Sequence, residues 1–221
     1  MPGRWVTFDC YGTIVDWNTA LVGALREVFG DEDPATLEGD FHDAEKRVKH
    51  GDDGYHRYRD VLAASVREMA AGRGHELREG EADVLGRAWG TIAPFADAAT
   101  GLGGLRDRGF RPAILTNCDD DLFALTRAQL PVPMDEVVTA EQVRSYKPDH
   151  AHFEEFRRRV QPDAWVHAAN SWEHDVVPAA ELGLPRIWVD RDRSGHDASL
   201  ASVRIEDFAR LAEEADRLAG G

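Results

Sequence analysis

The chain contains few cysteines, and it has no long apolar run. Only two of its 221 residues are cysteine, Cys10 and Cys118, and their spacing fits neither a C-x-x-C pair nor a disulfide framework. No apolar stretch approaches the ~18 residues of a membrane span, and the first residues lack the pattern of a signal peptide. These absences predict a cytoplasmic protein in a reducing compartment, with no membrane partner.

Positive charge is also scarce. The chain has 41 acidic residues against 26 lysines and arginines, which gives a formal net charge of -15 at pH 7. Nucleic acids and anionic membranes are bound mainly by clustered Lys and Arg, so this balance argues against both as partners. Lysine occurs only at positions 46, 49 and 147. We expect a small-molecule substrate, and the sequence leaves a homodimer open.

Two kinds of hydrophobic pattern divide the chain. From about residue 100, short apolar runs alternate with helical periods, which is typical of an α/β protein with a parallel sheet. Between about residues 17 and 94 the pattern is helical, with little strand signal. We therefore expect a catalytic core from residues 1–16 and 95–221, and an inserted helical cap domain from residues 17–94. The expected strands after the first are 111–115, 136–138, 164–169 and 186–189, and the expected helices include 19–29, 41–50, 55–71, 81–89, 173–182 and 206–218.

Polar clusters follow four of the predicted strands. They are Asp9 to Thr13, Thr116-Asn117, Lys147-Pro148, and the segment 170–175. The carboxyl ends of parallel strands meet at one edge of a sheet, which is where open α/β sheets bind their ligands. Helix capping is the commoner role for any one such cluster. Four clusters at equivalent places predict a site, in which Lys147 would balance the charge of the carboxylates.

These four motifs, in this order, resemble those of the haloacid dehalogenase superfamily. The resemblance spans nearly the whole chain and implies a Rossmann-like core with an inserted helical cap. Tyr11, two residues after Asp9, makes the first motif similar to that of the 2-haloacid dehalogenase (type II) branch. The motifs are Asp9-Cys10-Tyr11-Gly12-Thr13, Ile114-Leu115-Thr116-Asn117, Tyr146-Lys147-Pro148-Asp149, and His174-Asp175 with Ala179-Ala180 and Leu182-Gly183-Leu184.

The resemblance implies a role for each catalytic position. Asp9 would be the nucleophile that forms an ester intermediate, and Thr13 and Thr116 would hydrogen-bond its carboxylate and the reacting group. Lys147 would neutralise negative charge, and Asp175 would hold Lys147 or orient the hydrolytic water. A carboxylate is a weak nucleophile, so it benefits from this orientation and fixed charge. The expected substrate-binding residues are Tyr11, Trp17, Asn117, Asn170, Ser171 and Trp172.

Tyr11 distinguishes between two reactions. Phosphatases of this superfamily place an acid two residues after the nucleophile, where it protonates the departing alkoxide. A halide leaves as a stable anion and needs no proton, and tyrosine, with an ordinary pKa of about 10, is a poor acid at neutral pH. The first motif therefore favours displacement of a leaving group from the carbon of a small acid, without a metal or other cofactor.

Other features of the chain differ from the dehalogenase pattern. The helix expected to supply a substrate-binding arginine reads Phe41-His42-Asp43-Ala44-Glu45-Lys46-Arg47, which leaves Arg47 and His42 as substitutes. Position 153 carries Phe where the family has Tyr. Two alternatives stay open. One is a magnesium-dependent phosphohydrolase in which Asp9 and Asp175 hold the ion, with Asn170 or Glu173; the other is a weakly catalytic binding module.

Overall fold

A parallel sheet of six strands forms the centre of the described structure. In the computed structural model, which describes residues 3–50 and 54–220, the strand order is β3-β2-β1-β4-β5-β6, and every pair of neighbouring strands is parallel. The predicted α/β class is therefore confirmed. The strands are β1 (Arg4–Phe8), β2 (Phe110–Thr116), β3 (Glu136–Thr139), β4 (Ala164–Ala169), β5 (Arg186–Val189) and β6 (Val203–Ile205).

Helices cover both faces of this sheet, and the alternation of side chains along β1 shows how. Val6 and Phe8 belong to the larger apolar core, together with residues of α5 (Ala98–Asp107) and α10 (Leu211–Ala219). Trp5 points the opposite way, into a second core that includes residues of α8 (Ala151–Val160) and α9 (Val177–Glu181). Because successive strand residues face opposite sides, Thr7 lies on the second side, a position that matters for the site.

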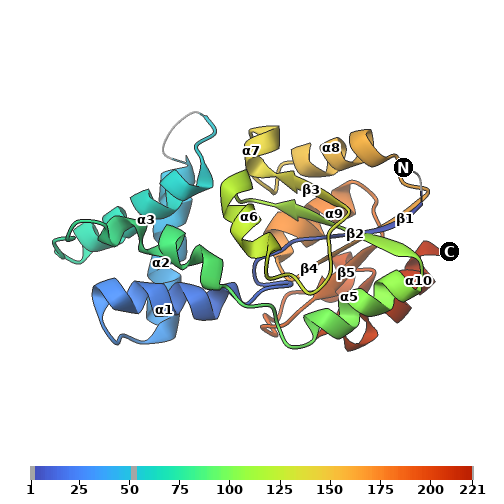
Figure 1. The fold of residues 1–221 in the computed structure, drawn as a ribbon, viewed down its shortest axis with the longest axis horizontal. Helices are drawn as coiled ribbons and strands as arrows, with labels where there is room; N and C mark the ends of the chain where they lie inside the picture. Colours follow the sequence, from blue (N-terminus) through green and yellow to red (C-terminus); the bar gives the residue numbers. More distant parts are fainter. Residues whose placement is uncertain (1–2, 51–53, 221) are drawn as a thin grey trace.

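The remaining helices lie where the strands end. In Figure 1 the helical segment between β1 and α5 lies beside the edge of the sheet toward which β1 runs. It begins directly after the first motif. This arrangement is consistent with the expected cap, while the division at residues 16/17 and 94/95 stays a prediction. The helices not yet given are α1 (Trp17–Phe29), α2 (Pro34–His50), α3 (Tyr58–Gly72), α4 (Val84–Ala88), α6 (Asp120–Arg127) and α7 (Ala140–Val143).

Several predicted boundaries need correction. Helix α2 begins seven residues earlier than expected, and α3 begins at Tyr58 rather than at residue 55. The segment expected as one helix over 173–182 is a π-helical turn, Trp172–Val176, followed by α9. Strand β6 was not predicted. None of the described helices is long and apolar enough to cross a lipid bilayer.

Candidate active site

Asp9 lies one residue beyond β1, at the carboxyl edge of the sheet. Its side chain is almost fully buried, with 8% of the residue exposed. Thr13 Oγ1 donates a hydrogen bond to Asp9 Oδ2 at 3.2 Å, and it accepts one from the backbone N–H of Asn170 at 2.9 Å. The loop between them turns at Gly12, whose φ of 82° is unfavourable for residues with a side chain. Thr13 thus joins the nucleophile candidate to the end of β4, as predicted for its contact with Asp9.

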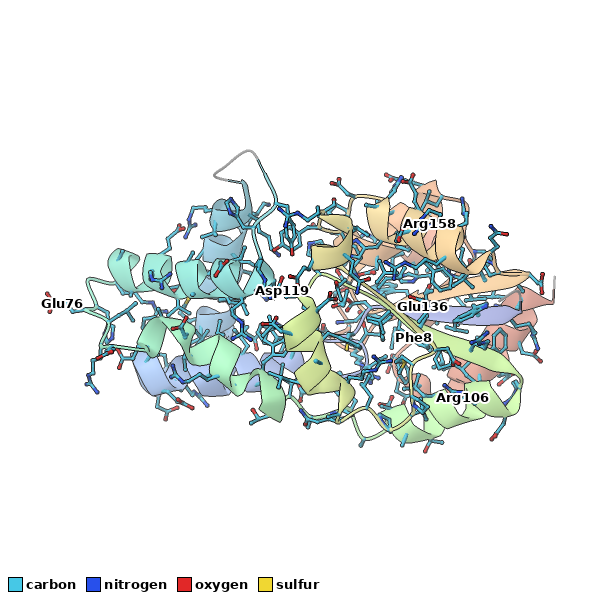
Figure 2. All side chains as sticks on the ribbon, turned by 45° about the horizontal axis from the view of Figure 1, so that its top comes forward. Phe8, Glu76, Arg106, Asp119, Glu136 and Arg158 are labelled. Atoms are coloured by element: carbon cyan, nitrogen blue, oxygen red, sulfur yellow. The ribbon has the colours of Figure 1, made fainter. Side chains whose placement is uncertain are left out.

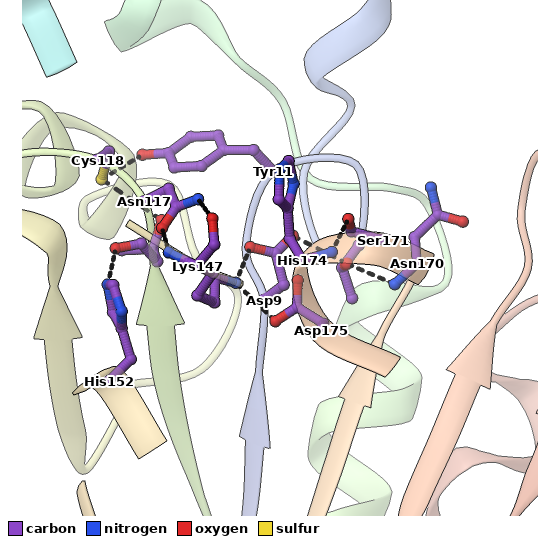
Figure 3. A network of polar contacts seen from close by, with 12 residues as sticks. Asp9, Tyr11, Asn117, Cys118, Lys147, His152, Asn170, Ser171, His174 and Asp175 are labelled. Atoms are coloured by element: carbon purple, nitrogen blue, oxygen red, sulfur yellow. Dashed lines mark hydrogen bonds and ion pairs between the residues drawn. The ribbon is translucent and has the colours of Figure 1, made fainter. Parts of the chain in front are cut away.

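A single ammonium group links two carboxylates at the centre of the site. Lys147 Nζ donates to Asp9 Oδ1 at 2.9 Å and to Asp175 Oδ1 at 2.6 Å, and all three side chains are buried (Figure 3). A buried lysine is stable only when its charge is paired. Segments separated by more than a hundred residues therefore meet here, as the four-motif pattern predicted.

The three charges affect one another's pKa values. Burial raises the pKa of Asp9 above its ordinary value of about 3.8, and Asp175 raises it further, while Lys147 acts in the opposite direction. Burial also disfavours the charge on Asp175, but Lys147 and a hydrogen bond from His167 outweigh this and lower its pKa to about 2. Burial opposes the charge on Lys147, yet the two carboxylates raise its pKa. Asp175 and Lys147 are therefore held in their charged forms more strongly than Asp9 is.

Asn117 positions Lys147 rather than only lining the pocket. Its Oδ1 accepts the backbone N–H of Lys147 at 2.7 Å, and its Nδ2 donates to the backbone carbonyl of Lys147 at 3.1 Å. Thr116 lies at the end of β2, where its hydroxyl donates to Cys118 Sγ at 3.6 Å; the hydrogen bond expected from it to the carboxylate or to the reacting group stays a prediction. The carbonyl of Thr116 accepts a hydrogen bond from His152.

Aromatic rings form one wall of the site. Tyr11 packs against Trp89 with ring centroids 4.7 Å apart, and Trp17 packs against the same indole at 4.9 Å. The Tyr11 hydroxyl accepts a hydrogen bond from Trp89 Nε1 and contacts Thr126 Oγ1 at 2.9 Å. Burial raises the pKa of Tyr11 well above its ordinary value, which makes it an even weaker acid. Tyr11 and Trp17 lie at the cavity, as predicted.

The residues expected after β4 have different positions. Asn170 and Ser171 line the cavity. However, Asn170 Nδ2 donates to Asp192, and Ser171 Oγ accepts the backbone N–H of His174. Trp172 is not among the residues that line the cavity: its ring packs on Trp188 and stacks on His196. The prediction that Trp172 forms a substrate wall is therefore wrong, because the π-helical turn directs the indole toward β5.

A cavity of about 300 Å³ opens above Asp9 and is lined by both the sheet edge and the helical segment. From α2 it receives His42, Glu45 and Lys49, and from α3 Tyr58. Of the two proposed substitutes for the missing arginine, only His42 lies there. Arg47 instead pairs with Glu68 on the outer surface.

His167 was not among the predicted site residues, yet it contacts Asp175. Trp165 Nε1 donates to Thr7 Oγ1, which lies 2.8 Å from His167 Nδ1, and His167 Nε2 lies 3.0 Å from Asp175 Oδ1. An indole can only donate, so the Thr7 hydroxyl is free to donate to Nδ1, and the imidazole proton is assigned to Nε2. His167 therefore donates to the Asp175 carboxylate. The only signal in the sequence was alternation, which places Thr7 and His167 on one face of neighbouring strands.

The donor set does not fit a magnesium ion well. Lys147 Nζ lies between the two carboxylates that would hold the ion, and the Asn170 side chain is directed to Asp192. Glu173 lines a different hollow, next to α8 and α9. Among the described side chains, those of residues 3–49 and 54–220, no three of His, Cys, Asp or Glu are grouped so that they could hold a metal. The ammonium group would have to move before a divalent ion could bind both carboxylates.

Comparison with known proteins agrees with the motifs. A model of the haloacid dehalogenase-like hydrolases matches residues 4–213. The chain belongs to this family. (S)-2-haloacid dehalogenase 1 of Pseudomonas sp. strain CBS-3 is 26% identical over 215 residues, which cover 92% of this chain and 91% of that protein. A shorter match, 29% identical over 136 residues, covers 55% of this chain and 58% of the glyceraldehyde 3-phosphate phosphatase of Methanothermobacter thermautotrophicus.

Solved structures show the same fold in this hydrolase family. A crystal structure of an L-2-haloacid dehalogenase has a TM-score of 0.83 at 21% identity and covers 98% of this chain and 100% of that chain. The L-2-haloacid dehalogenase of Xanthobacter autotrophicus with chloropropionic acid covalently bound has a TM-score of 0.78 at 16% identity, covering 99% and 100%. Motifs and relatives together associate this hydrolase with the 2-haloacid dehalogenase branch.

Proposed function

We propose that this protein displaces a leaving group, in the simplest case a halide, from C2 of a small acid and releases the corresponding hydroxy acid. The observation that carries the proposal is the pairing of Asp9 with Lys147 beside a tyrosine that cannot act as an acid. This arrangement supplies a nucleophile and a fixed positive charge, and it offers no proton donor two residues after Asp9.

In the first step an Asp9 carboxylate oxygen attacks the carbon that bears the leaving group. The carbon–halogen bond breaks with its electron pair on the halide, and an ester forms between Asp9 and the substrate. Thr13 and Lys147 each hold one oxygen of the carboxylate, which fixes its orientation toward the cavity. The aromatic wall of Tyr11, Trp17 and Trp89 would exclude water from the reacting carbon.

In the second step the oxygen of a water molecule bonds to the carbonyl carbon of the Asp9 ester and the bond from that carbon to the substrate oxygen breaks. The hydroxy acid leaves with one proton of the water, the other proton passes to solvent, and the Asp9 carboxylate is regenerated. Asp175 is the group placed to orient that water. Its Oδ1 accepts hydrogen bonds from Lys147 and His167, whereas its Oδ2 is buried and has no hydrogen-bond partner among the described side chains. An unpartnered buried carboxylate oxygen beside the cavity is a ready acceptor for a water proton.

Halide release from (S)-2-chloropropionate and (S)-2-bromopropionate tests the proposal directly. We expect wild-type protein to release halide and Asp9→Asn to fall to the background of the assay. Asp43→Asn, the same change at an exposed position of α2, is the matched control. Wild-type protein that releases no halide from any small 2-haloacid would overturn the assignment.

A second measurement separates the ester mechanism from direct attack by water. Many turnovers in heavy-oxygen water should place the label in the Asp9 carboxylate, because water attacks the carbonyl of the ester and not the substrate carbon. Mass spectrometry of the peptide that contains Asp9 reports this label. An unlabelled Asp9 after many turnovers would exclude the ester, and an absence of any turnover would favour the binding module.

The phosphohydrolase alternative retains one supporting observation, the phosphatase among the relatives. It predicts hydrolysis of p-nitrophenyl phosphate that EDTA abolishes. The position of Lys147 and the missing acid at position 11 both favour the carbon-centred reaction instead.

A further inference from the structure

The cap side of the cavity carries an ion pair that faces the substrate space. Lys49 Nζ donates to Glu45 Oε1 at 2.8 Å, and the Tyr58 hydroxyl donates to the same oxygen at 2.7 Å. Both side chains of the pair are partly exposed to solvent, 15% of the Lys49 side chain and 12% of the Glu45 side chain. The two residues are one turn apart on α2, so both of their charged groups reach the same region.

The surroundings hold this pair in place and keep Glu45 charged. Although burial opposes its charge, the pKa of Glu45 is lowered strongly by Lys49, by His42 and by the Tyr58 hydroxyl. The Lys49 ammonium lies 4.9 Å from the ring centroid of Tyr58 and 5.0 Å from that of Tyr146, within the range of cation–π attraction. The cap wall therefore presents a fixed negative group next to a fixed positive one.

A substrate whose only charged group is a carboxylate does not complement the Glu45–Lys49 pair. No arginine is among the described residues that line the cavity, and Lys49 is the one cation that α2 contributes to it. A substrate carboxylate bound to Lys49 would come close to Glu45, and two like charges at that distance repel. A ligand that carries a carboxylate and an ammonium group would satisfy both members of the pair at once. Such a zwitterion would also be neutral overall, in a protein of net charge -15.

We propose that Glu45 and Lys49 form a recognition pair that selects a small acid bearing an amino group close to its carboxylate, with Lys49 binding the carboxylate and Glu45 the ammonium. The inference rests on the proposed function for the reacting carbon and adds the class of substrate. It makes Glu45 a specificity-determining residue that the motif pattern does not include.

Binding of two unreactive ligands tests the pair without any turnover. Propionate and β-alanine differ by one ammonium group, and NMR titration or calorimetry gives both dissociation constants. We expect wild-type protein to bind β-alanine at least about 10-fold more tightly, equivalent to about 1.4 kcal/mol. Glu45→Gln should remove most of this preference, whereas Asp43→Asn, the same charge change on the outer side of α2, should keep it.

The outcomes separate this inference from the proposed function. If Glu45 had a purely structural role, Glu45→Gln would weaken the binding of both ligands alike and leave the ratio of their dissociation constants unchanged. That result would overturn the inference. Equal binding by wild-type protein, tighter binding of propionate, or no detectable binding of either ligand would overturn it as well. Halide release is measured in parallel from 2-chloropropionate and 3-amino-2-chloropropionate. Absence of release from both would overturn the proposed function, while a β-alanine preference that depends on Glu45 would still stand.

Discussion

At the scale of single residues, the site depends on a chain of buried hydrogen bonds that begins outside the four motifs. It runs from Trp165 through Thr7 and His167 to Asp175, and from there through Lys147 to Asp9. Trp165 donates to Thr7, Thr7 donates to His167, and His167 donates to Asp175. These hydrogen bonds fix the orientation of the Asp175 carboxylate. This is a positioning role, because His167 does not line the cavity.

Replacing His167 by phenylalanine should disturb the reaction through Asp175. The hydrogen bond that helps to lower the pKa of Asp175 would be lost, so this pKa should rise from about 2. We expect kcat to fall by roughly 10-fold or more, as for a lost hydrogen bond to a charged group of about 1.5–3 kcal/mol, with little change in KM. His167→Gln can still donate and should restore part of kcat. Steady-state kinetics of both variants checks this, and an equal loss in both would contradict it.

The free energy of unfolding should also depend on pH through the Asp175 carboxylate, and it should decrease in acid. Asp175 has a lower pKa in the folded protein than in the unfolded chain, so its stabilising contribution is complete above about pH 4 and is lost as the pH falls toward 2. In His167→Phe the folded-state pKa of Asp175 should lie closer to the unfolded value, so this contribution should be smaller and its loss should be complete at higher pH. Urea unfolding of wild type and variant between pH 3 and pH 6 measures the difference between their free energies of unfolding, which should be largest near pH 6 and should narrow as the pH decreases, because protonation of Asp175 removes its contribution from both proteins. A constant difference would exclude the proposed coupling.

The raised pKa of Asp9 predicts the acid side of the activity profile. In the proposed mechanism Asp9 attacks only as a carboxylate, and burial together with Asp175 raises its pKa above about 3.8. We therefore expect kcat/KM to decrease below an apparent pKa that lies above this value and belongs to the coupled carboxylates. The measurement is kcat/KM for a 2-haloacid between pH 3.5 and pH 8, in the range where the protein stays folded. A profile that is flat down to pH 4 would contradict it.

At the scale of elements, local signals predicted the sheet better than the helices. The bounds of β4 and β5 match the predicted 164–169 and 186–189, because apolar runs bounded by polar turns mark buried strands clearly. Helix α2 begins at Pro34 after Asp33, whose side chain caps the backbone N–H of Thr36 at 3.1 Å. An Asp followed by Pro is a helix-start signal, and the prediction of this helix did not use it.

The start of α3 could not be read from nearby residues. Asp119, in the loop after β2, accepts the backbone N–H groups of Tyr58 and Arg59 at 2.9 and 2.8 Å. Figure 2 shows Asp119 at the junction of the helical segment and the sheet. The cap of this helix is thus about 60 residues away in sequence, and only the folded chain brings it into place. Glu45 and His167 were missed for the same reason, since their roles come from contacts between elements and not from a motif.

A pair of glycines in α5 tests packing at this scale. Gly101 and Gly103 both lie inside this helix. A methyl group at Gly101 would lie 2.4 Å from Phe208 Cβ, whereas at Gly103 it would meet nothing within 4 Å. Gly101→Ala should destabilise the protein by about 1–3 kcal/mol, and Gly103→Ala should stabilise it by up to about 1 kcal/mol. Chemical denaturation measures both, and equal effects would show that α5 and Phe208 adjust without cost.

At the scale of the whole molecule, the net charge of -15 opposes the approach of any anionic substrate. Salt screens such long-range repulsion, with a Debye length of about 30 Å at 0.01 M and about 10 Å at 0.1 M. Attraction between Lys49 and a substrate carboxylate acts over a short distance inside the cavity and is screened much less. The two effects can therefore be separated by ionic strength.

We expect kcat/KM for 2-chloropropionate to increase a few-fold as the ionic strength rises from about 0.01 M to about 0.1 M, since repulsion between like charges weakens. A zwitterionic 3-amino-2-chloropropionate carries no net charge, so its kcat/KM should change little over the same range. Sodium sulfate is a suitable salt because it contains neither a halide nor a carboxylate. A decrease for 2-chloropropionate would mean that local cations, and not the field of the whole molecule, control the approach of the substrate.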